Sequence, residues 1–258
     1  MVRVSVGVLA RNNEDIIGPC LDSVQWADDL FVILDTRSSD ATDSIAEMHG
    51  ARVVRHPFED FARQREFGLT QHDCDWLFYL DSDERATDAL AAEIRKVVAK
   101  NDPVGWWVPR RNFLFGHETR HGGWYPDYQL RLLKRGHAHY DLERQVHEVV
   151  DLDGPAGHLC EPLLHHNYET LGQFRAKQQQ YVSYEAAIRY QNGVRPKPWT
   201  YVLQPLREFW RRYIALSGYR DGVHGLVLCT LVAYYYGYLV TVQLGRLWAQ
   251  RGENLSRE

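Results

Sequence analysis

Three acidic residues, Asp81, Asp83 and Glu84, follow directly after the apolar run from Trp76 to Leu80. Carboxylates crowded at the end of a buried segment repel one another and resist desolvation unless a cation or a basic group lies among them. Side chains two positions apart in an extended segment share a face, so Asp81 and Asp83 can bind one cation together. Such hard oxygen ligands suit Mg2+ or Mn2+ shared with substrate phosphates. The alternative is a surface turn, because turns are rich in Asp.

Two further polar clusters follow apolar runs nearer the N-terminus. One is "LDTRSSDAT", residues 34–42, and the other contains Asn13 and Glu14. The Asp, Ser and Thr side chains of the first cluster could form a turn and cap a helix that starts near Asp40. If the three apolar runs are parallel strands, however, all three clusters lie at one rim of the sheet, which capping alone does not explain.

The elements that must position these clusters alternate between strands and helices. Strands separated by helices of about 10 to 15 residues indicate a mostly parallel sheet of the doubly wound kind. In such sheets ligands bind beyond the carboxyl ends of the strands. The predicted strands are residues 2–9, 30–34, 51–55 and 76–80, and the predicted helices are residues 16–25, 40–49 and 59–71.

The pattern changes after the acidic residues. A helix is expected over residues 87–100, with Thr87 as its N-cap. Two strands, "GWWVPRRN" and "YQLRLLKRG", then flank a loop rich in Gly and His. Beyond about residue 168 the chain is predicted to be helical, first over residues 171–191 and then over residues 199–216.

The last predicted helix is unusual, because residues 222–245 contain no Asp, Glu, Lys or Arg. About twenty apolar residues can span a bilayer, but an interfacial helix or one buried between subunits gives the same pattern. Residues 195–220 hold six basic residues against one acid, Glu208, with Trp, Tyr and Phe interleaved. Residues 195–247 are therefore expected to contact an anionic membrane surface. The alternative is a helical subdomain packed on the core or on a second subunit.

Composition narrows the function classes. The 258 residues are 45% hydrophobic and 25% charged, which is ordinary for a globular protein. The net charge of -4 argues against a protein that binds nucleic acid through a general positive field. The four cysteines lack the short spacings of a zinc site or a disulfide framework and fit a reducing cytoplasm. The short alternating apolar run at the N-terminus suits a first strand and not a signal peptide.

Three ordered motifs, "VGVLARNNEDIIGPCLDSV", "LDTRSSDAT" and "FYLDSDE", resemble the nucleotide-sugar-binding half of the inverting glycosyltransferases of family 2. That family has the GT-A fold, a Rossmann-like, mostly parallel mixed sheet flanked by helices. The later stretches "WYPDYQLRLLKRG", "VHEVV" and "GYRDGVHG" resemble the branch of lipopolysaccharide-core β-1,4-glucosyltransferases. The resemblance implies a GT-A catalytic domain over residues 1–167. Residues 168–258 are then a helical region for acceptor, membrane or oligomer contacts.

The resemblance also implies roles for single residues. The segment 10–14 and Asp35 would hold the base and ribose of the nucleotide. Asp81 and Asp83 would bind the diphosphate through Mg2+ or Mn2+, and His165 would complete the metal shell. With the polar clusters and the helix before Asp81, the expected substrate-binding residues are Ala10, Asn13, Glu14, Asp35, Ser38, Asp40, Gln64, Arg65, Asp81, Ser82 and Arg131.

The catalytic base is the point at which the sequence departs from the family. The usual Glu-Asp pair is replaced by His147-Glu148, so Glu148 is the candidate base and Asp127 in "WYPDYQ" is the alternative. Displacement at an anomeric carbon needs such a base and a counter-charge for the departing diphosphate. Simpler roles stay open, with Glu148 paired to Arg144 on a strand and His165 as a buried, hydrogen-bonded histidine.

We therefore predict a metal-dependent, inverting glycosyltransferase. It would move a hexose, glucose in the nearest resemblance, from a UDP-sugar to a glycan acceptor. The acceptor would be lipid-linked, as in lipopolysaccharide core, at the cytoplasmic face of the inner membrane, and a homo-oligomer is an open possibility. The alternatives are transfer to polyprenyl phosphate or protein, a non-catalytic nucleotide-binding scaffold, and a metal-dependent phosphohydrolase, for which further carboxylates near Asp81 are missing.

Overall fold

The structure is a computed structural model and describes residues 1–100, 102–142 and 150–255. The chain forms two compact units. Unit 1 contains residues 1–111 and 127–165, and unit 2 contains residues 112–126 and 166–258. Residues 112–126 thus group with the C-terminal helices, while the expected functional division after residue 167 stays a prediction.

A mixed sheet organises the first part of the chain, with the strand order β3-β2-β1-β4-β8-β6-β12-β5. The first four strands in that order are parallel, and β8 joins β4 and β6 in antiparallel fashion. The strands are β1 Val4–Ala10, β2 Asp29–Asp35, β3 Arg52–His56, β4 Trp76–Asp81, β5 Glu84–Arg85, β6 Gly105–Leu114, β7 His117–Thr119, β8 Asp127–Lys134, β9 Ala138–Tyr140, β10 Val150–Leu152, β11 Ala156–His158 and β12 Leu163–Tyr168.

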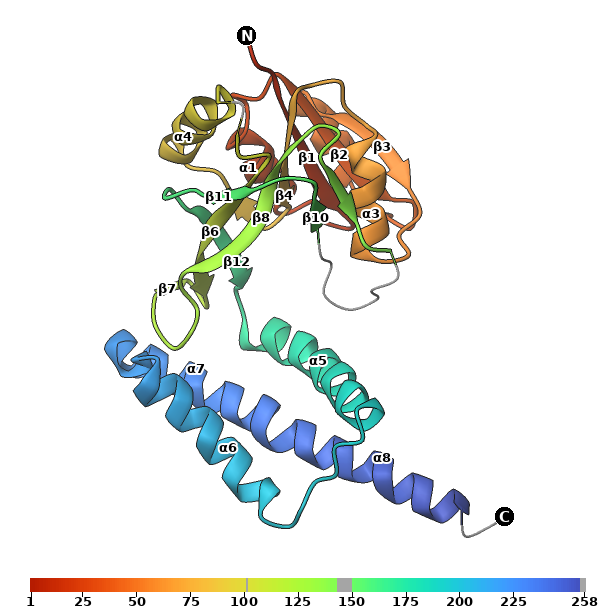
Figure 1. Ribbon diagram of the computed structural model, residues 1–258, viewed down its shortest axis with the longest axis vertical. Coiled ribbons are helices and arrows are strands. Elements are labelled where there is room, and N and C mark those ends of the chain that lie inside the picture. Colours follow the sequence, from red (N-terminus) through yellow and green to blue (C-terminus); the bar gives the residue numbers. More distant parts are fainter. Residues whose placement is uncertain (101, 143–149, 256–258) are drawn as a thin grey trace. The chain divides into compact units, whose positions relative to one another are not determined.

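Helices cover both faces of this sheet in unit 1 (Figure 1). One face packs against α1, α2 and α4 through residues such as Val6 and Phe78. The other packs against α3, with Phe31 and Tyr79 in its cluster. Strands buried on both faces are continuous apolar runs, which explains the runs in the sequence. The helices are α1 Ile17–Asp22, α2 Thr42–Met48, α3 Phe61–Leu69 and α4 Asp88–Val98.

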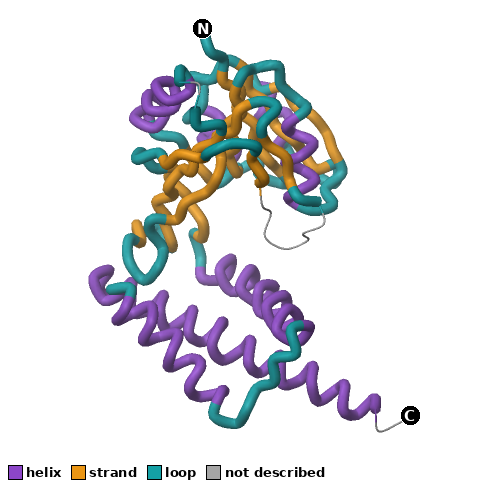
Figure 2. Tube along the Cα trace, viewed as in Figure 1, coloured by secondary structure: helices purple, strands orange, loops and turns teal. Residues whose placement is uncertain are grey.

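Unit 2 is mainly helical (Figure 2). Its core joins Phe174 and Val182 of α5 to Leu228, Val232 and Tyr235 on the last long helix. The elements are α5 Leu171–Gln191, α6 Thr200–Trp210, a π-helical turn Arg211–Ala215, a 3-10 turn Gly218–Asp221, α7 Gly222–Val232, a π-helical segment Ala233–Leu239 and α8 Val240–Leu255.

The close packing of α6 on the last helix depends on small residues. A Cβ atom at Gly237 would overlap the backbone of Pro205, and one at Gly245 would overlap the hydroxyl of Tyr201. Pro205 and Tyr201 are four residues apart in α6, so they lie on one face of that helix. Glycine therefore permits the close approach of α6 to the last helix at these two positions.

The predicted elements are confirmed in kind, with shifts at their ends. Thr87 caps α4 by accepting a hydrogen bond from the backbone N–H of Leu90 at 3.1 Å. The first helix is shorter than predicted, because residues after Asp22 form turns in which the Ser23 hydroxyl donates to the carbonyl of Cys20 at 2.7 Å. The polar cluster of residues 34–42 provides no side-chain cap at the N-cap position of α2, because that residue is Ala41.

Candidate active site

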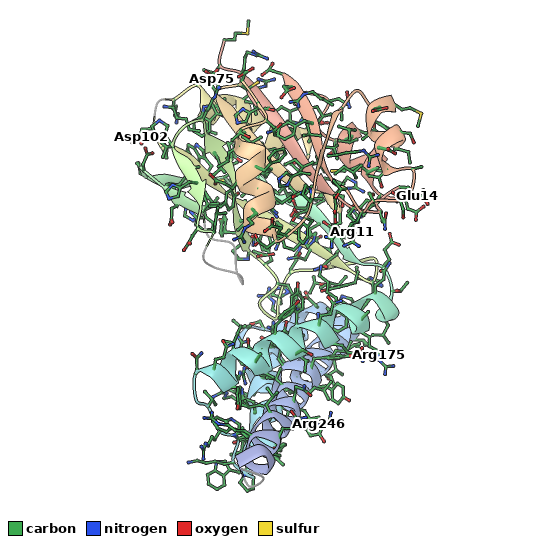
Figure 3. The ribbon with its side chains drawn as sticks, turned by 90° about the vertical axis from the view of Figure 1, so that its right-hand side faces the viewer. Arg11, Glu14, Asp75, Asp102, Arg175 and Arg246 are labelled. Atoms are coloured by element: carbon green, nitrogen blue, oxygen red, sulfur yellow. The ribbon has the colours of Figure 1, made fainter. Side chains whose placement is uncertain are left out.

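The carboxyl ends of the parallel strands bring the predicted polar clusters to one edge of unit 1. In the register of the sheet, Leu9 of β1 pairs with Asp81 of β4, and Ala10 pairs with Leu34, next to Asp35. Figure 3 shows Arg11 and Glu14, which follow β1, at a different end of unit 1 from Asp75, which precedes β4. The edge thus forms as the sequence predicted.

The loops after β1 and β2 are joined by hydrogen bonds. Three backbone N–H groups of the first loop donate to side chains of the second, and the second loop donates back to Glu14 and Asn12. Many predicted substrate residues therefore fix the edge itself. The bonds run from Asn12 N to Ser38 Oγ (2.9 Å), Asn13 N to Thr42 Oγ1 (2.8 Å), Glu14 N to Asp40 Oδ2 (3.0 Å), Ala41 N to Glu14 Oε2 (2.9 Å) and Ser39 N to Asn12 Oδ1 (2.9 Å).

Asp35 is a buried carboxylate at the end of β2. The Nη2 atom of Arg37 lies 2.9 Å from Oδ2 of Asp35, and the Nε atom of Arg11 lies 3.4 Å from the same oxygen. Burial alone would raise the pKa of Asp35, but hydrogen bonds from the side chain and backbone of Arg37 and from the backbone of Phe58 lower it. Asp35 is therefore held ionised at neutral pH.

Asp81, at the end of β4, lies between two buried arginines. Nη2 of Arg65 donates to Oδ1 at 2.7 Å, and Nη2 of Arg131 donates to Oδ2 at 2.5 Å. The two guanidinium groups come from α3 and β8, and both residues are at least 95% buried. Burial raises the pKa of Asp81, but the charges of Arg131 and Arg65 outweigh burial and lower it. The basic groups that crowded carboxylates require are thus arginines.

Glu84 is fully buried and connects the ion pairs of Asp81 to the ion pair of Arg110 with Asp127. Its Oε2 accepts from the backbone N–H of Asp81 at 2.9 Å, and its Oε1 lies 3.2 Å from Nη1 of Arg110 and 3.5 Å from Nη2 of Arg131. Arg110 donates in turn to Oδ2 of Asp127 at 2.6 and 2.9 Å. Burial alone would lower the pKa of Arg110, but Glu84 and Asp127 raise it, so Arg110 is charged.

Asp83 and His165 are the predicted metal ligands that the structure brings together. Nε2 of His165 lies 3.4 Å from Oδ2 of Asp83, and the register of β5 and β12 places His165 opposite Glu84. Carboxylate and imidazole suit Mn2+, whose shell the oxygens of a substrate diphosphate would complete. Across the residues the structure describes, no group of three or more His, Cys, Asp or Glu forms a complete metal cage. The pair thus fits an ion shared with substrate.

The remaining predicted residues are mostly buried supports. Ala10 and Ser82 are buried at the ends of β1 and β4. Gln64 is 2% exposed and its Oε1 lies 2.9 Å from Nδ1 of His56 at the end of β3. The thiol of Cys20 lies 3.5 Å from the backbone carbonyl oxygen of Asp81, and burial raises the pKa of that thiol.

Of the two candidates for the catalytic base, Glu148 and Asp127, the structure describes only Asp127. His147 and Glu148 lie outside the described residues. Asp127 is described, and both of its oxygens accept hydrogen bonds, Oδ2 from Arg110 and Oδ1 from Gln129 at 2.9 Å. Its place at the start of β8 makes it an anchor for Arg110 in this structure.

Sequence reasoning did not single out Arg110, Arg37 or Arg11. A register shift between Trp106 and Trp107 hides which of the two arginines in "VPRRN" points to the site, because it breaks the two-residue alternation of β6. The contact of Arg37 could have been predicted from the sequence. Arg37 lies only two positions after Asp35, so its side chain can reach the Asp35 carboxylate.

Residues 5–148, more than half of the chain, match the family model described as glycosyl transferase family 2. The edge described above belongs to a glycosyltransferase with the GT-A fold, a mixed sheet flanked by helices and followed by a helical region. The chain belongs to glycosyl transferase family 2, as its motifs predicted.

One curated relative matches along nearly the whole chain. It is the lipopolysaccharide core biosynthesis glycosyltransferase LpsC of Rhizobium meliloti (strain 1021), 29% identical over 90% of this chain and 88% of the relative. A solved structure with partial similarity is glucosyl-3-phosphoglycerate synthase of Mycobacterium tuberculosis in complex with Mn2+, UDP and glucosyl-3-phosphoglycerate. Its TM-score is 0.46 and its identity 17%, over 76% of this chain and 82% of that one.

Proposed function

We propose that this glycosyltransferase moves a hexose from a UDP-sugar to a glycan acceptor, with inversion at the anomeric carbon and a divalent metal. The observation that carries the proposal is the pair of Asp83 and His165 beside the arginine-rich edge. Asp83 lies within the segment that matches the family. The pair offers ligands for a cation, and a bound cation supplies the counter-charge that a departing diphosphate requires.

Asp35 and the joined loops after β1 and β2 would bind the nucleoside. Asp35 is ionised, and we propose that it accepts hydrogen bonds from ribose hydroxyls. Arg65 and Arg131 hold Asp81 in one orientation beside the predicted diphosphate position. A bound Mg2+ or Mn2+ would neutralise charge on the diphosphate as it leaves.

For the base we propose Glu148, since Asp127 is engaged with Arg110 and Gln129. A carboxylate removes the proton of the acceptor hydroxyl as that oxygen attacks the anomeric carbon from the side opposite the diphosphate. Such a base contributes about two to four orders of magnitude in rate. Glu148→Gln should therefore bind UDP like the wild type while its turnover falls by about that much. Full turnover in this variant, with loss in Asp127→Asn, would move the role to Asp127.

The proposed acceptor class rests on similarity to one relative. The relative LpsC is named for lipopolysaccharide core biosynthesis, and the match covers most of both chains. We propose a lipid-linked glycan of that class, reached at the cytoplasmic face of the inner membrane. Product analysis by mass spectrometry with a set of glycan, polyprenyl phosphate and peptide acceptors would decide between the acceptor classes.

The first test is calorimetric titration of UDP, and then of GDP, into the protein with Mn2+ and with EDTA. We expect UDP binding that needs the metal and is lost in Asp83→Asn. Asp73→Asn is the matched control, because Asp73 is exposed and lies at the amino ends of the strands. Metal-independent binding, or equal binding by both variants, would refute the proposed metal role. Donor binding without transfer to any acceptor would instead favour a non-catalytic scaffold.

A further inference from the structure

Helix α6 of unit 2 carries an apolar face that points away from its packing partner. Tyr201 and Pro205 face the last helix, where they meet Gly245 and Gly237. The opposite side of α6 and its N-cap is exposed and almost entirely apolar. We call these residues the α6 face: Trp199, Val202, Leu203, Leu206 and Trp210, which are 56 to 60% exposed.

The spacing of the α6 face shows that it is one continuous stripe. Trp199, Leu203, Leu206 and Trp210 follow one another at intervals of four, three and four residues, so they are neighbours along one side of the helix. Val202 lies three residues after Trp199 and four before Leu206, so it widens the same stripe. A water-exposed helix normally shows polar residues on its outer side. Five large apolar side chains on the outer side, two of them Trp, indicate that something other than water covers them.

Two basic residues, Arg207 and Lys197, border the α6 face. Arg207 is exposed and lies four residues after Leu203 and three before Trp210, so it borders the stripe. Lys197 lies with its Nζ 5.3 Å from the centre of the Trp199 ring. Arg195, Arg211 and Arg220 are also exposed. The acid of this region, Glu208, is 15% exposed and is paired with Arg211 at 2.9 Å.

Charge and aromatic content favour a lipid surface over a second copy of the chain. In a symmetric dimer the same patch meets itself, so basic side chains would approach basic side chains. An anionic lipid surface attracts them instead, while Trp and Tyr settle at the level of the headgroups. The long helix from Gly218 to Arg251 is apolar enough to cross a bilayer, but half of its most apolar window is buried within the protein. Spanning would require that packing to be lost.

We propose that the α6 face docks unit 2 onto an anionic lipid surface, with its apolar side chains among the acyl chains and its basic border on the headgroups. The helix lies in the plane of the interface and does not cross it. The inference stands on unit 2 alone and needs neither the donor nor the metal, so it can fail while the proposed transfer holds.

The test is co-sedimentation of the full chain with extruded vesicles of phosphatidylcholine, with and without phosphatidylglycerol. We expect binding that needs the anionic lipid and weakens at about 0.5 M salt, where charges are screened within a few ångströms. Leu203→Ser with Leu206→Ser should weaken partitioning about tenfold or more, because buried leucines drive it. Arg207→Gln should weaken it about fivefold.

Matched controls replace exposed residues of unit 1. Met48→Ser removes an apolar side chain that is 76% exposed, and Lys96→Gln removes an exposed charge, and neither should change vesicle binding. The proposal is overturned if the wild type binds no vesicle, or if the double leucine variant binds as well as the wild type. It is equally overturned if ultracentrifugation shows a dimer that the leucine variant dissociates, since a second copy then covers the face.

Discussion

Asp81 and Asp83 are two residues apart, yet their carboxylates have different partners. Asp81 is bonded to two buried arginines, whereas Asp83 faces an imidazole, and the two side chains are similarly exposed, 28% and 27%. An anion that balances buried cations supports the fold, and an anion with open coordination sites can receive a ligand. The two residues of the motif therefore divide support and ligand binding between them.

Asp81→Asn should destabilise the protein as well as inactivate it. The substitution leaves Arg65 and Arg131 buried without their common counter-charge, and removing one partner of a buried ion pair costs about 3 to 5 kcal/mol. Urea unfolding followed by circular dichroism would measure the change. Asp83→Asn is the comparison and should unfold like the wild type, because the ion pair shown for its carboxylate is with His165 and not with a buried arginine.

The acid dependence of stability should show the same contribution. The pKa of Asp81 is lowered in the folded state, so its stabilisation is complete above the unfolded value of about 3.9 and is lost as the pH falls through the lower folded value. The stability difference between wild type and Asp81→Asn should then be constant from neutral pH to about pH 5 and shrink below about pH 4. A difference that grows in acid would contradict this assignment.

The carboxylates of the site could be predicted from the sequence, whereas their arginine partners largely could not. Asp35, Asp81 and Asp83 end or follow strands, and strand ends are visible in the sequence. Arg65 was predicted to bind the substrate, whereas in the structure its hydrogen bond to Asp81 joins α3 to β4. Arg110 comes from β6, after the bulge, and depends on a register that only the folded sheet defines.

At the scale of elements, long helices and strands could be predicted from the sequence more readily than short ones. The helix α5 spans Leu171–Gln191 as predicted, because Thr170 and Gln173 form a capping box at its start. Strands β5, β7 and β9 to β12 were not predicted. All of them except β12 have only two or three residues, which carry no periodicity. Their positions follow from pairing with longer strands or with one another.

The packing of α6 gives a prediction at this scale. Gly237→Ala should destabilise unit 2 by about 1 to 3 kcal/mol, the usual cost of overpacking, because the new methyl group meets the backbone of Pro205. A Cβ atom at Gly172 in α5 would meet the hydroxyl of Thr170 at 3.7 Å, an ordinary contact, so Gly172→Ala should be neutral or stabilising. Thermal unfolding of the two variants would measure the difference. Equal melting temperatures would show that α6 shifts to accept the methyl group.

At the scale of the whole molecule, charge is unevenly distributed. The chain carries a net charge of -4, yet residues 195–220 contain six basic residues and one acid. An acidic protein with one basic, apolar region meets an anionic surface through that region, because the rest of the surface is repelled. A lipid-linked acceptor and the enzyme would then share one interface.

Membrane docking should therefore affect acceptors selectively. With an acceptor embedded in anionic vesicles, Leu203→Ser with Leu206→Ser should lower the transfer rate about tenfold, in line with its lost partitioning. With a short, water-soluble acceptor the same variant should keep the wild-type rate. Radiolabelled sugar transfer to both acceptors would measure this. An equal loss on both would mean that these leucines serve the reaction and not the docking.

The thiol of Cys20, which lies next to the backbone carbonyl of Asp81, can report local opening of the site. Cys20 is buried and its raised pKa keeps it protonated, while Cys160 is exposed. A thiol reagent can reach Cys20 only during excursions that part the end of β4 from α1, so its labelling rate counts those excursions. A nucleotide that holds the edge closed should slow the labelling of Cys20 and leave that of Cys160 unchanged. The labelling rate of Cys20 therefore measures how often the edge of the sheet opens locally.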